Sequence, residues 1–205
     1  MVKATATFAM LRPILLNKAI TLATRMLFYK AFIPPALVFG CESWALTKPL
    51  GSRLDAAQMA FLRRMTGANL LDHIPNDRIL SRCGCLAVTD LISRQRMRWL
   101  GHLTRMDSAR LPWQIFQGGL ARGSRGPGRP RTFIQDGYRD DVARMSAKGG
   151  DFHERRPGQG FWDQAQDRVA WRRLINGTWA TRASLSKPAG AQRFSRTHTA
   201  LPPDT

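Results

Sequence analysis

The segment 90–106 constrains the fold most, because its sequence fits a long helix with two different faces. At 100° per residue, Arg94, Arg98 and Arg105 fall within about 40° of one another. The opposite side carries an apolar row: Ile92, Trp99, Leu103 and Met106. Thr89 stands just before the segment as a candidate N-cap. The pattern predicts a helix that packs on one side and presents arginines on the other.

Two residues inside this predicted helix indicate how it packs. Gly101 costs about 1 kcal/mol relative to alanine within a helix, so we expect it to mark close packing against a neighbour. Arg96 projects near the apolar side, where we expect it to snorkel or to pair with a carboxylate. We expect Trp99 to pack against the core, with stacking on a nucleic-acid base as the alternative, and His102 to be half-buried and hydrogen-bonded.

Further helices are predicted on both sides of this segment. The first runs from Asn17 or Thr21 to Phe32 and ends at Pro34-Pro35, and residues 37–40 then form a short extended piece. The second begins near Ser52, with Asp55 as a capping-box partner, and ends at Gly67. Its predicted apolar face comprises Leu54, Ala57, Phe61, Leu62 and Met65. Shorter or weaker helical patterns cover 76–84, 132–145 and 161–175, so the fold class is mainly α.

The composition along the chain suggests four parts. Residues 1–116 form a small helical bundle. Residues 117–131 contain five glycines, two prolines and four arginines, which is typical of a linker. Residues 132–176 form a C-terminal helical segment, and residues 177–205 are polar and patternless, which predicts a disordered tail.

The net charge of +18, which comes from 26 arginines and only 6 lysines, favours a polyanionic partner. Arginine binds phosphate through two parallel hydrogen bonds and stacks on bases. An acidic membrane is less favoured, because no helix pairs a lysine-rich face with a large apolar one. The candidate phosphate contacts are Arg94, Arg98 and Arg105 on the helix and Arg122, Arg125, Arg129 and Arg131 in the linker. The alternatives are an ordinary solvated helix face and a flexible linker.

Five blocks occur in a fixed order along the chain: LFYKAFIPPALVFGCESWALT (27–47), RLDAAQMAFLRRMTG (53–67), RQRMRWLGHLTRM (94–106), GSRGPGRPRTFIQD (123–136) and AQDRVAWRRLI (165–175). Together they resemble the thumb and the following C-terminal region of reverse transcriptases from non-LTR retrotransposons. The resemblance covers about residues 8–175. It implies a thumb-like bundle that grips RNA, DNA or an RNA–DNA duplex.

The resemblance does not imply catalysis by this chain, because the polymerase aspartates of that family lie in a palm upstream. The adjacent pair Asp140-Asp141 sits in a helical context instead. Asp136, Asp140 and Asp141 as metal ligands of a residual nuclease are the enzymatic alternative, against simple pairing with Arg139 and Arg144. We expect neither a cofactor nor a metal. A zinc site at Cys83 and Cys85, with His73 and His102, lacks the usual ligand spacing.

The chain has three cysteines, and their spacing is not that of a disulfide framework, which suggests a reducing compartment. We therefore expect a nuclear or cytoplasmic protein. A mitochondrial presequence is the alternative, since no acid precedes Glu42. We expect no membrane helix, because the longest apolar run, 31–40, is short and contains two prolines.

Two further alternatives to nucleic-acid binding stay open. One is a scaffold protein whose basic face meets an acidic protein, and the other is a relic reading frame without selected function.

Overall fold

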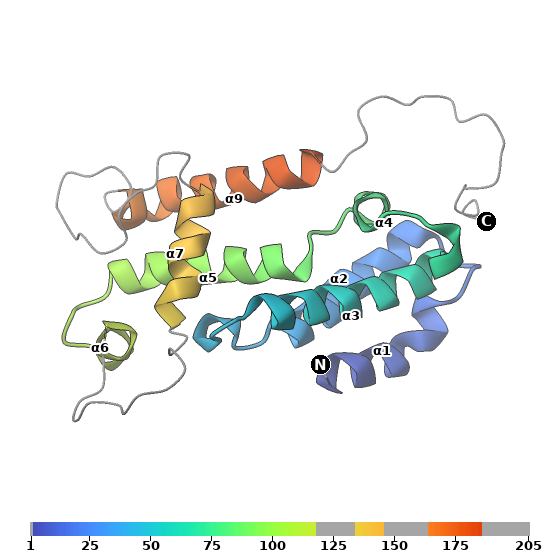
Figure 1. The fold of residues 1–205 in the computed structure, drawn as a ribbon, viewed down its shortest axis with the longest axis horizontal. Helices are drawn as coiled ribbons and strands as arrows, with labels where there is room; N and C mark the ends of the chain where they lie inside the picture. Colours follow the sequence, from blue (N-terminus) through green and yellow to red (C-terminus); the bar gives the residue numbers. More distant parts are fainter. Residues whose placement is uncertain (1, 118–133, 146–163, 186–205) are drawn as a thin grey trace. The chain divides into compact units, whose positions relative to one another are not determined.

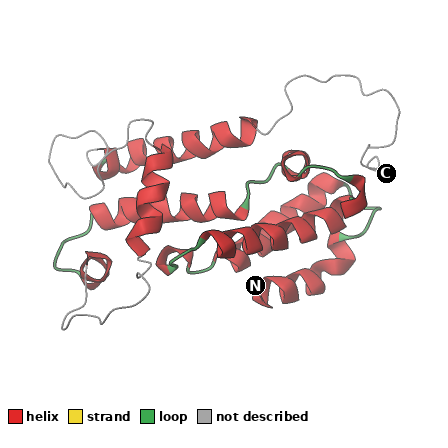
Figure 2. Cartoon of the chain, viewed as in Figure 1, coloured by secondary structure: helices red, strands yellow, loops and turns green. Residues whose placement is uncertain are grey.

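The computed structural model describes residues 2–117, 134–145 and 164–185 (Figure 1). Every regular element within these ranges is helical (Figure 2), which confirms the mainly-α prediction. The elements are α1 (Val2–Leu15), α2 (Leu22–Val38), η1 (Cys41–Ser43), α3 (Lys48–Thr66), η2 (Leu70–Asp72), α4 (Asn76–Cys83), α5 (Val88–Thr104), α6 (Leu111–Gln117), α7 (Ile134–Met145) and α9 (Arg168–Leu185).

The chain divides into two compact units. The first comprises Met1–Phe39, Thr47–Leu91 and Trp179–Thr205, and the second comprises Gly40–Leu46 and Ile92–Thr178. Two of the unit boundaries, after Leu91 and Thr178, fall inside helices α5 and α9, whereas the composition suggested boundaries after residues 116, 131 and 176. The predicted linker beyond Gln117 lies outside the described residues. The tail prediction is wrong at its start, because α9 continues to Leu185 and buries Trp179.

Helix α2 runs through both of its prolines, so the predicted stop at Pro34-Pro35 is wrong. The helix begins as predicted at Thr21, whose hydroxyl accepts a hydrogen bond from the Thr24 backbone N–H at 3.3 Å. Two prolines remove two backbone donors from the helix. The side chains of Ile33 and Leu37, on either side of them, are fully buried, and this burial offsets the loss. Residues 37 and 38 are consequently helical and not extended.

The helical segment 22–43, which comprises α2 and η1, is long and apolar enough to cross a membrane, judged by length and composition alone. The sequence pattern had not predicted such a helix. One third of its apolar window, 33%, is buried inside the protein. Core helices and N-terminal signal sequences meet the same criterion.

Helix α3 begins at Lys48, four residues before the predicted start, and ends as predicted at Gly67, whose φ is 73°. Leu54, Phe61 and Leu62 of the predicted apolar face are buried, as is Met65, whereas Ala57 is half-buried. Asp55 does not close a capping box with Ser52. Its carboxylate accepts hydrogen bonds from the Thr89 backbone N–H at 3.1 Å and the Thr89 hydroxyl at 2.9 Å. Asp55 thus caps α5 from another helix.

The core of the first unit forms between α1, α2 and α3. The rings of Phe8 and Phe61 stack with their centroids 4.6 Å apart. Arg25 of α2 is buried, with 6% of its surface exposed, and its guanidinium donates to the backbone carbonyls of Ile20, Leu15 and Met65. A basic residue of the N-terminal segment therefore serves to satisfy buried backbone acceptors.

A buried polar network organises the second unit around Arg96 of α5. Its guanidinium lies 3.5 Å from a carboxylate oxygen of Asp141 and donates to the Cys41 and Trp44 carbonyls at 3.4 and 2.6 Å. Of the two alternatives expected for Arg96, snorkelling or pairing with a carboxylate, the structure shows the pairing. Gly137 of α7 gives it room, since a Cβ there would lie 2.6 Å from Arg96 Nη1. The network joins α5, α7 and the segment 40–46.

Candidate nucleic-acid interface

The predicted arginine stripe lies on the less buried side of α5. Arg98 is exposed, and Arg94 and Arg105 are half-buried. Ile92 and Leu103 are fully buried as predicted, whereas Trp99 and Met106 are only half-buried. The buried side is completed by residues that the predicted row did not include, namely Met97 and Leu100. The buried face of α5 is therefore wider than the predicted row and is rotated away from Trp99 and Met106, towards Met97 and Leu100.

Helix α9 lies alongside α5 and antiparallel to it, and the contacts between residues 92–105 and 165–176 include the residues just before α9 (Figure 1). Arg94 donates to the Asn176 side chain at 2.9 Å, the Trp171 indole donates to the Met97 carbonyl at 2.8 Å, and Arg105 donates to the Ala165 carbonyl. Residue numbers thus fall along α9 as they rise along α5. A Cβ on Gly101 would overlap the indole of Trp171, which confirms close packing at this glycine.

The antiparallel register places arginines of the two helices beside one another. We call Arg94, Arg98 and Arg105 of α5 together with Arg168 and Arg172 of α9 the arginine seam. Burial lowers the pKa of Arg98, and the neighbouring charges of Arg94 and Arg172 lower it further. Burial and the charge of Arg168 likewise lower the pKa of Arg105. Both guanidinium groups stay charged in proteins, so the lowered pKa values indicate partial desolvation first and like-charge repulsion second.

Among the described residues, no carboxylate forms an ion pair with an arginine of the seam. The nearest acid in sequence, Asp167, uses its carboxylate to accept from the Val169 and Ala170 backbone N–H groups at the start of α9. The seam is therefore a concentration of positive charge that an external anion would stabilise.

Sequence reasoning missed the α9 half of the seam. The signal was present, because Arg168 and Arg172 are four residues apart in the predicted helix 161–175 and hence share one face. The α5 half was found from its own periodicity. The four linker arginines predicted as contacts, Arg122, Arg125, Arg129 and Arg131, lie outside the described residues.

An aromatic pair lies beside the arginines of α5. The ring centroids of Trp99 and His102 are 5.3 Å apart and the ring planes are inclined by 48°. Trp99 is half-buried and His102 is exposed, so His102 is less buried than predicted. Gln95, on the same side of α5, donates a hydrogen bond to the Glu42 carboxylate at 2.9 Å.

Two of the three acidic residues considered as nuclease ligands are engaged in other contacts, and the third, Asp140, is exposed. Asp141 is buried, accepts from the Ser93 hydroxyl and pairs with Arg96 and Arg144. Asp136 pairs with Arg139 at 3.3 Å, as the simpler interpretation predicted. In the part of the chain that the structure describes, no three His, Cys, Asp or Glu side chains gather as metal ligands would. Cys83 and Cys85 are reduced cysteines, and the Cys85 thiol donates to the Cys83 carbonyl at 3.6 Å.

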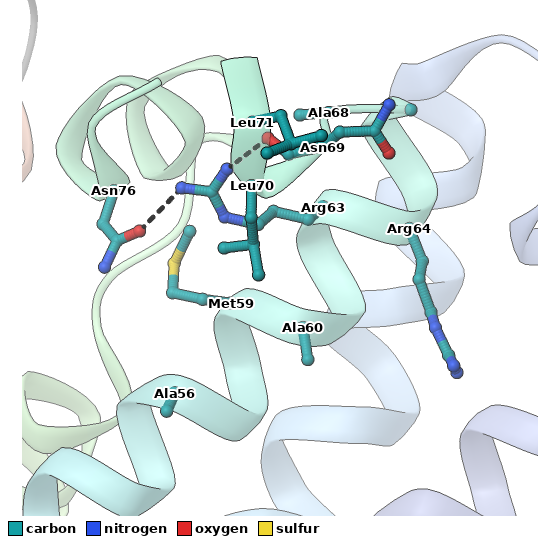
Figure 3. A pocket seen from close by; sticks show the side chains of 11 residues that line it. Ala56, Met59, Ala60, Arg63, Arg64, Ala68, Asn69, Leu70, Leu71 and Asn76 are labelled. Atoms are coloured by element: carbon teal, nitrogen blue, oxygen red, sulfur yellow. Dashed lines mark hydrogen bonds between the residues drawn. The ribbon is translucent and has the colours of Figure 1, made fainter. Parts of the chain in front are cut away.

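A pocket of about 810 Å³ opens beside the C-terminal half of α3 and η2 (Figure 3). Met59 lines it, and Leu70 and Leu71 of η2 stand at it with 78% and 85% of their surfaces exposed. Arg63 is not available to a ligand there, because it donates to the Asn69 and Ile74 carbonyls and to the Asn76 side chain. The pocket is lined mainly by apolar residues; of its two arginines, Arg63 is engaged by backbone carbonyls and Arg64 is exposed.

We compared the chain with models of protein families, with curated proteins and with solved structures, and found no match in any of the three. The geometry of the arginine seam is therefore the basis for a functional conclusion, together with the sequence resemblance described above.

Proposed function

We propose that this protein is a non-catalytic nucleic-acid-binding module whose arginine seam contacts phosphates. The observation that carries the proposal is the like-charge cluster between α5 and α9. Arg98 lies close enough to Arg94 and Arg172 for their charges to lower its pKa, yet none of the three has a carboxylate partner among the described residues. Repulsion of this kind costs stability unless an anion offsets it.

A polyanionic backbone fits the seam better than a small anion does. On α5, the stripe from Arg94 to Arg105 spans about 16 Å at 1.5 Å per residue, which is several times the 3.4 Å rise per nucleotide of one strand. Contacts of this kind fix a nucleic acid in place without reading its sequence. The role matches what the resemblance to a retrotransposon reverse transcriptase thumb implies, namely a grip on RNA, DNA or an RNA–DNA duplex.

The proposal is tested by measuring the affinity of the full chain for labelled RNA, DNA and hybrid oligonucleotides by fluorescence anisotropy at several NaCl concentrations. The logarithm of affinity should fall linearly with the logarithm of salt concentration. Arg98→Ala and Arg172→Ala should weaken binding on all sequences and reduce the salt slope by about 1 each. Arg53→Ala, an exposed arginine of α3, removes the same charge elsewhere and is the matched control.

Absent or salt-independent binding would contradict the proposal. Equal losses in Arg53→Ala and Arg98→Ala would also contradict it, because they would reduce the effect to net charge. A stoichiometric protein partner that persists in a nuclease-treated lysate, with no oligonucleotide binding by the pure chain, would favour the scaffold alternative instead.

A further inference from the structure

The open face of α5 has a cationic edge and an aromatic edge. Taking 100° per residue from Arg98, His102 lies at about 40° and Trp99 at about 100° around the helix. Gly101, against which Trp171 of α9 packs, lies about 60° away in the opposite direction. Arginines therefore line the edge beside α9, and the Trp99–His102 pair lines the other edge.

We infer that this face binds single-stranded nucleic acid, with phosphates on the arginine seam and an unpaired base stacked against Trp99 and His102. The inference rests on the proposed function and assigns it a class of ligand. Aromatic platforms beside a basic groove are how proteins hold single strands without reading sequence. A duplex keeps its bases stacked inside the helix, so a base reaches an aromatic platform only when it is unpaired.

The aromatic pair is suited to stacking because it is held in place and still accessible. Trp99 is half-buried, so part of its indole is anchored while the rest faces solvent. His102 is exposed one turn further on and contacts the indole with ring centroids 5.3 Å apart. Neither ring has to be ordered on binding, which lowers the entropic cost of association.

The charges on this face give the strand an orientation. Glu42 lies on the aromatic side, where it accepts a hydrogen bond from Gln95, and its carboxylate repels a phosphate. The arginine seam on the other side attracts one. The backbone of a bound strand therefore follows the seam, and its bases point towards Trp99.

The experiment compares a labelled oligo(dT) or oligo(U) with a blunt duplex of the same length, each titrated with the full chain. The variants are Trp99→Ala, Trp99→Phe and His102→Ala, with Phe32→Ala, an aromatic residue of α2 that is 48% exposed, as the control. Trp99→Ala should weaken single-strand binding about 5- to 150-fold, the range that corresponds to loss of one stacked base. Its duplex affinity and its salt slope should stay unchanged, and Trp99→Phe should retain most of the single-strand affinity.

An equal loss on single strand and duplex, or no loss on either, overturns this inference while leaving the proposed function standing. Failure of the unaltered protein to bind any oligonucleotide removes the proposed function as well. Because Trp99 is half-buried, thermal unfolding is measured for each variant. Should Trp99→Ala not fold, unchanged single-strand binding in His102→Ala overturns the inference. Stronger binding of polyglutamate than of an oligonucleotide of equal charge, unaffected by Trp99→Phe, overturns it in favour of an acidic protein partner.

Discussion

Gly101 of α5 and Trp171 of α9 are packed so closely that a single added methyl group would overlap the indole ring. The indole nitrogen also donates a hydrogen bond to the Met97 carbonyl one turn earlier on α5. This contact fixes the distance and register of the two helices, and with them the positions of the arginines along the seam.

We expect Gly101→Ala to destabilise the protein, although alanine is the better helix former. The overlap with Trp171 should cost about 1–3 kcal/mol, which exceeds the gain of about 1 kcal/mol in helix propensity. Gly177→Ala in α9 is the matched control, since a Cβ there meets no atom within 4 Å, and it should be stabilising. Urea unfolding followed by circular dichroism measures both; a stable Gly101→Ala protein would show that the helix pair is less tightly packed.

Loss of Arg96 should be among the most damaging changes in the second unit. Arg96→Met removes the buried partner of the Asp141 carboxylate and leaves it only Ser93 and the more distant, partly exposed Arg144, so it should cost about 3–5 kcal/mol of unfolding free energy at neutral pH. Burial raises the pKa of Asp141 even in the presence of Ser93 and Arg96. Without Arg96 the carboxylate protonates more readily, so the loss should shrink as the pH falls.

The control for Arg96 is the pair of Arg139 with Asp136, whose side chains are 42% and 45% exposed. Arg139→Gln should change the unfolding free energy by less than about 1 kcal/mol, because exposed ion pairs contribute little. Comparable losses in Arg139→Gln and Arg96→Met would contradict a special role for the buried pair.

The cap that Asp55 provides to α5 is also testable. Asp55→Ala removes the acceptor of both Thr89 hydrogen bonds and should cost about 0.5–2 kcal/mol. Asp55→Asn keeps one side-chain acceptor and should retain part of that stability. If Ser52 and Asp55 formed a capping box at the start of α3 instead, Ser52→Ala would be as costly as Asp55→Ala in the same unfolding measurement.

The thiols should be unreactive in the native protein. Burial raises the pKa of Cys41 to about 12 and that of Cys85 to about 11, so neither is a thiolate at pH 8.5. Iodoacetamide labelling followed by mass spectrometry should therefore be slow at both positions in buffer. Labelling should be rapid in about 8 M urea, in which the protein is unfolded. Rapid labelling of Cys41 in buffer would show that the segment 40–46 opens easily.

The same thiols predict a loss of stability in alkali. Because their folded pKa values lie above the unfolded value of about 8.5, their contribution is complete below that pH and is lost as the pH rises towards 11 and 12. Burial raises the pKa of Tyr29 and of Tyr138 too, which acts in the same direction. The melting temperature should thus fall steadily above pH 9, and a flat profile to pH 11 would contradict the burial of these groups.

Reversing one charge of the seam should separate stability from binding. Arg98→Glu removes its repulsion with Arg94 and Arg172 and supplies an ion-pair partner, so the melting temperature of the free protein should rise. Binding to oligonucleotides should fall in the same variant. Loss of both stability and binding would instead indicate that Arg98 has a structural role.

The sequence by itself determined the helical class, the helix ends at Gly67 and Gly84, and the arginine stripe of α5. Each of these follows from interactions within a short stretch of chain. A glycine with a left-handed backbone conformation ends a helix, and the spacing of apolar and charged residues separates the buried face of a helix from its exposed face. The close packing at Gly101 was also predictable from the sequence. A glycine inside a helix lowers the stability of that helix, and close packing against a neighbour offsets the loss.

Only the tertiary structure decided which arginines are exposed and which are buried. Arg25 and Arg96 have the same chemistry as Arg98, but they are buried because backbone carbonyls and Asp141 lie within their reach. Helix α2 continues through two prolines because Ile33 and Leu37 are buried, and Arg94 meets Asn176 from 82 residues away. Such partners are distant along the chain, and periodicity within one segment carries no information about the segment that packs against it.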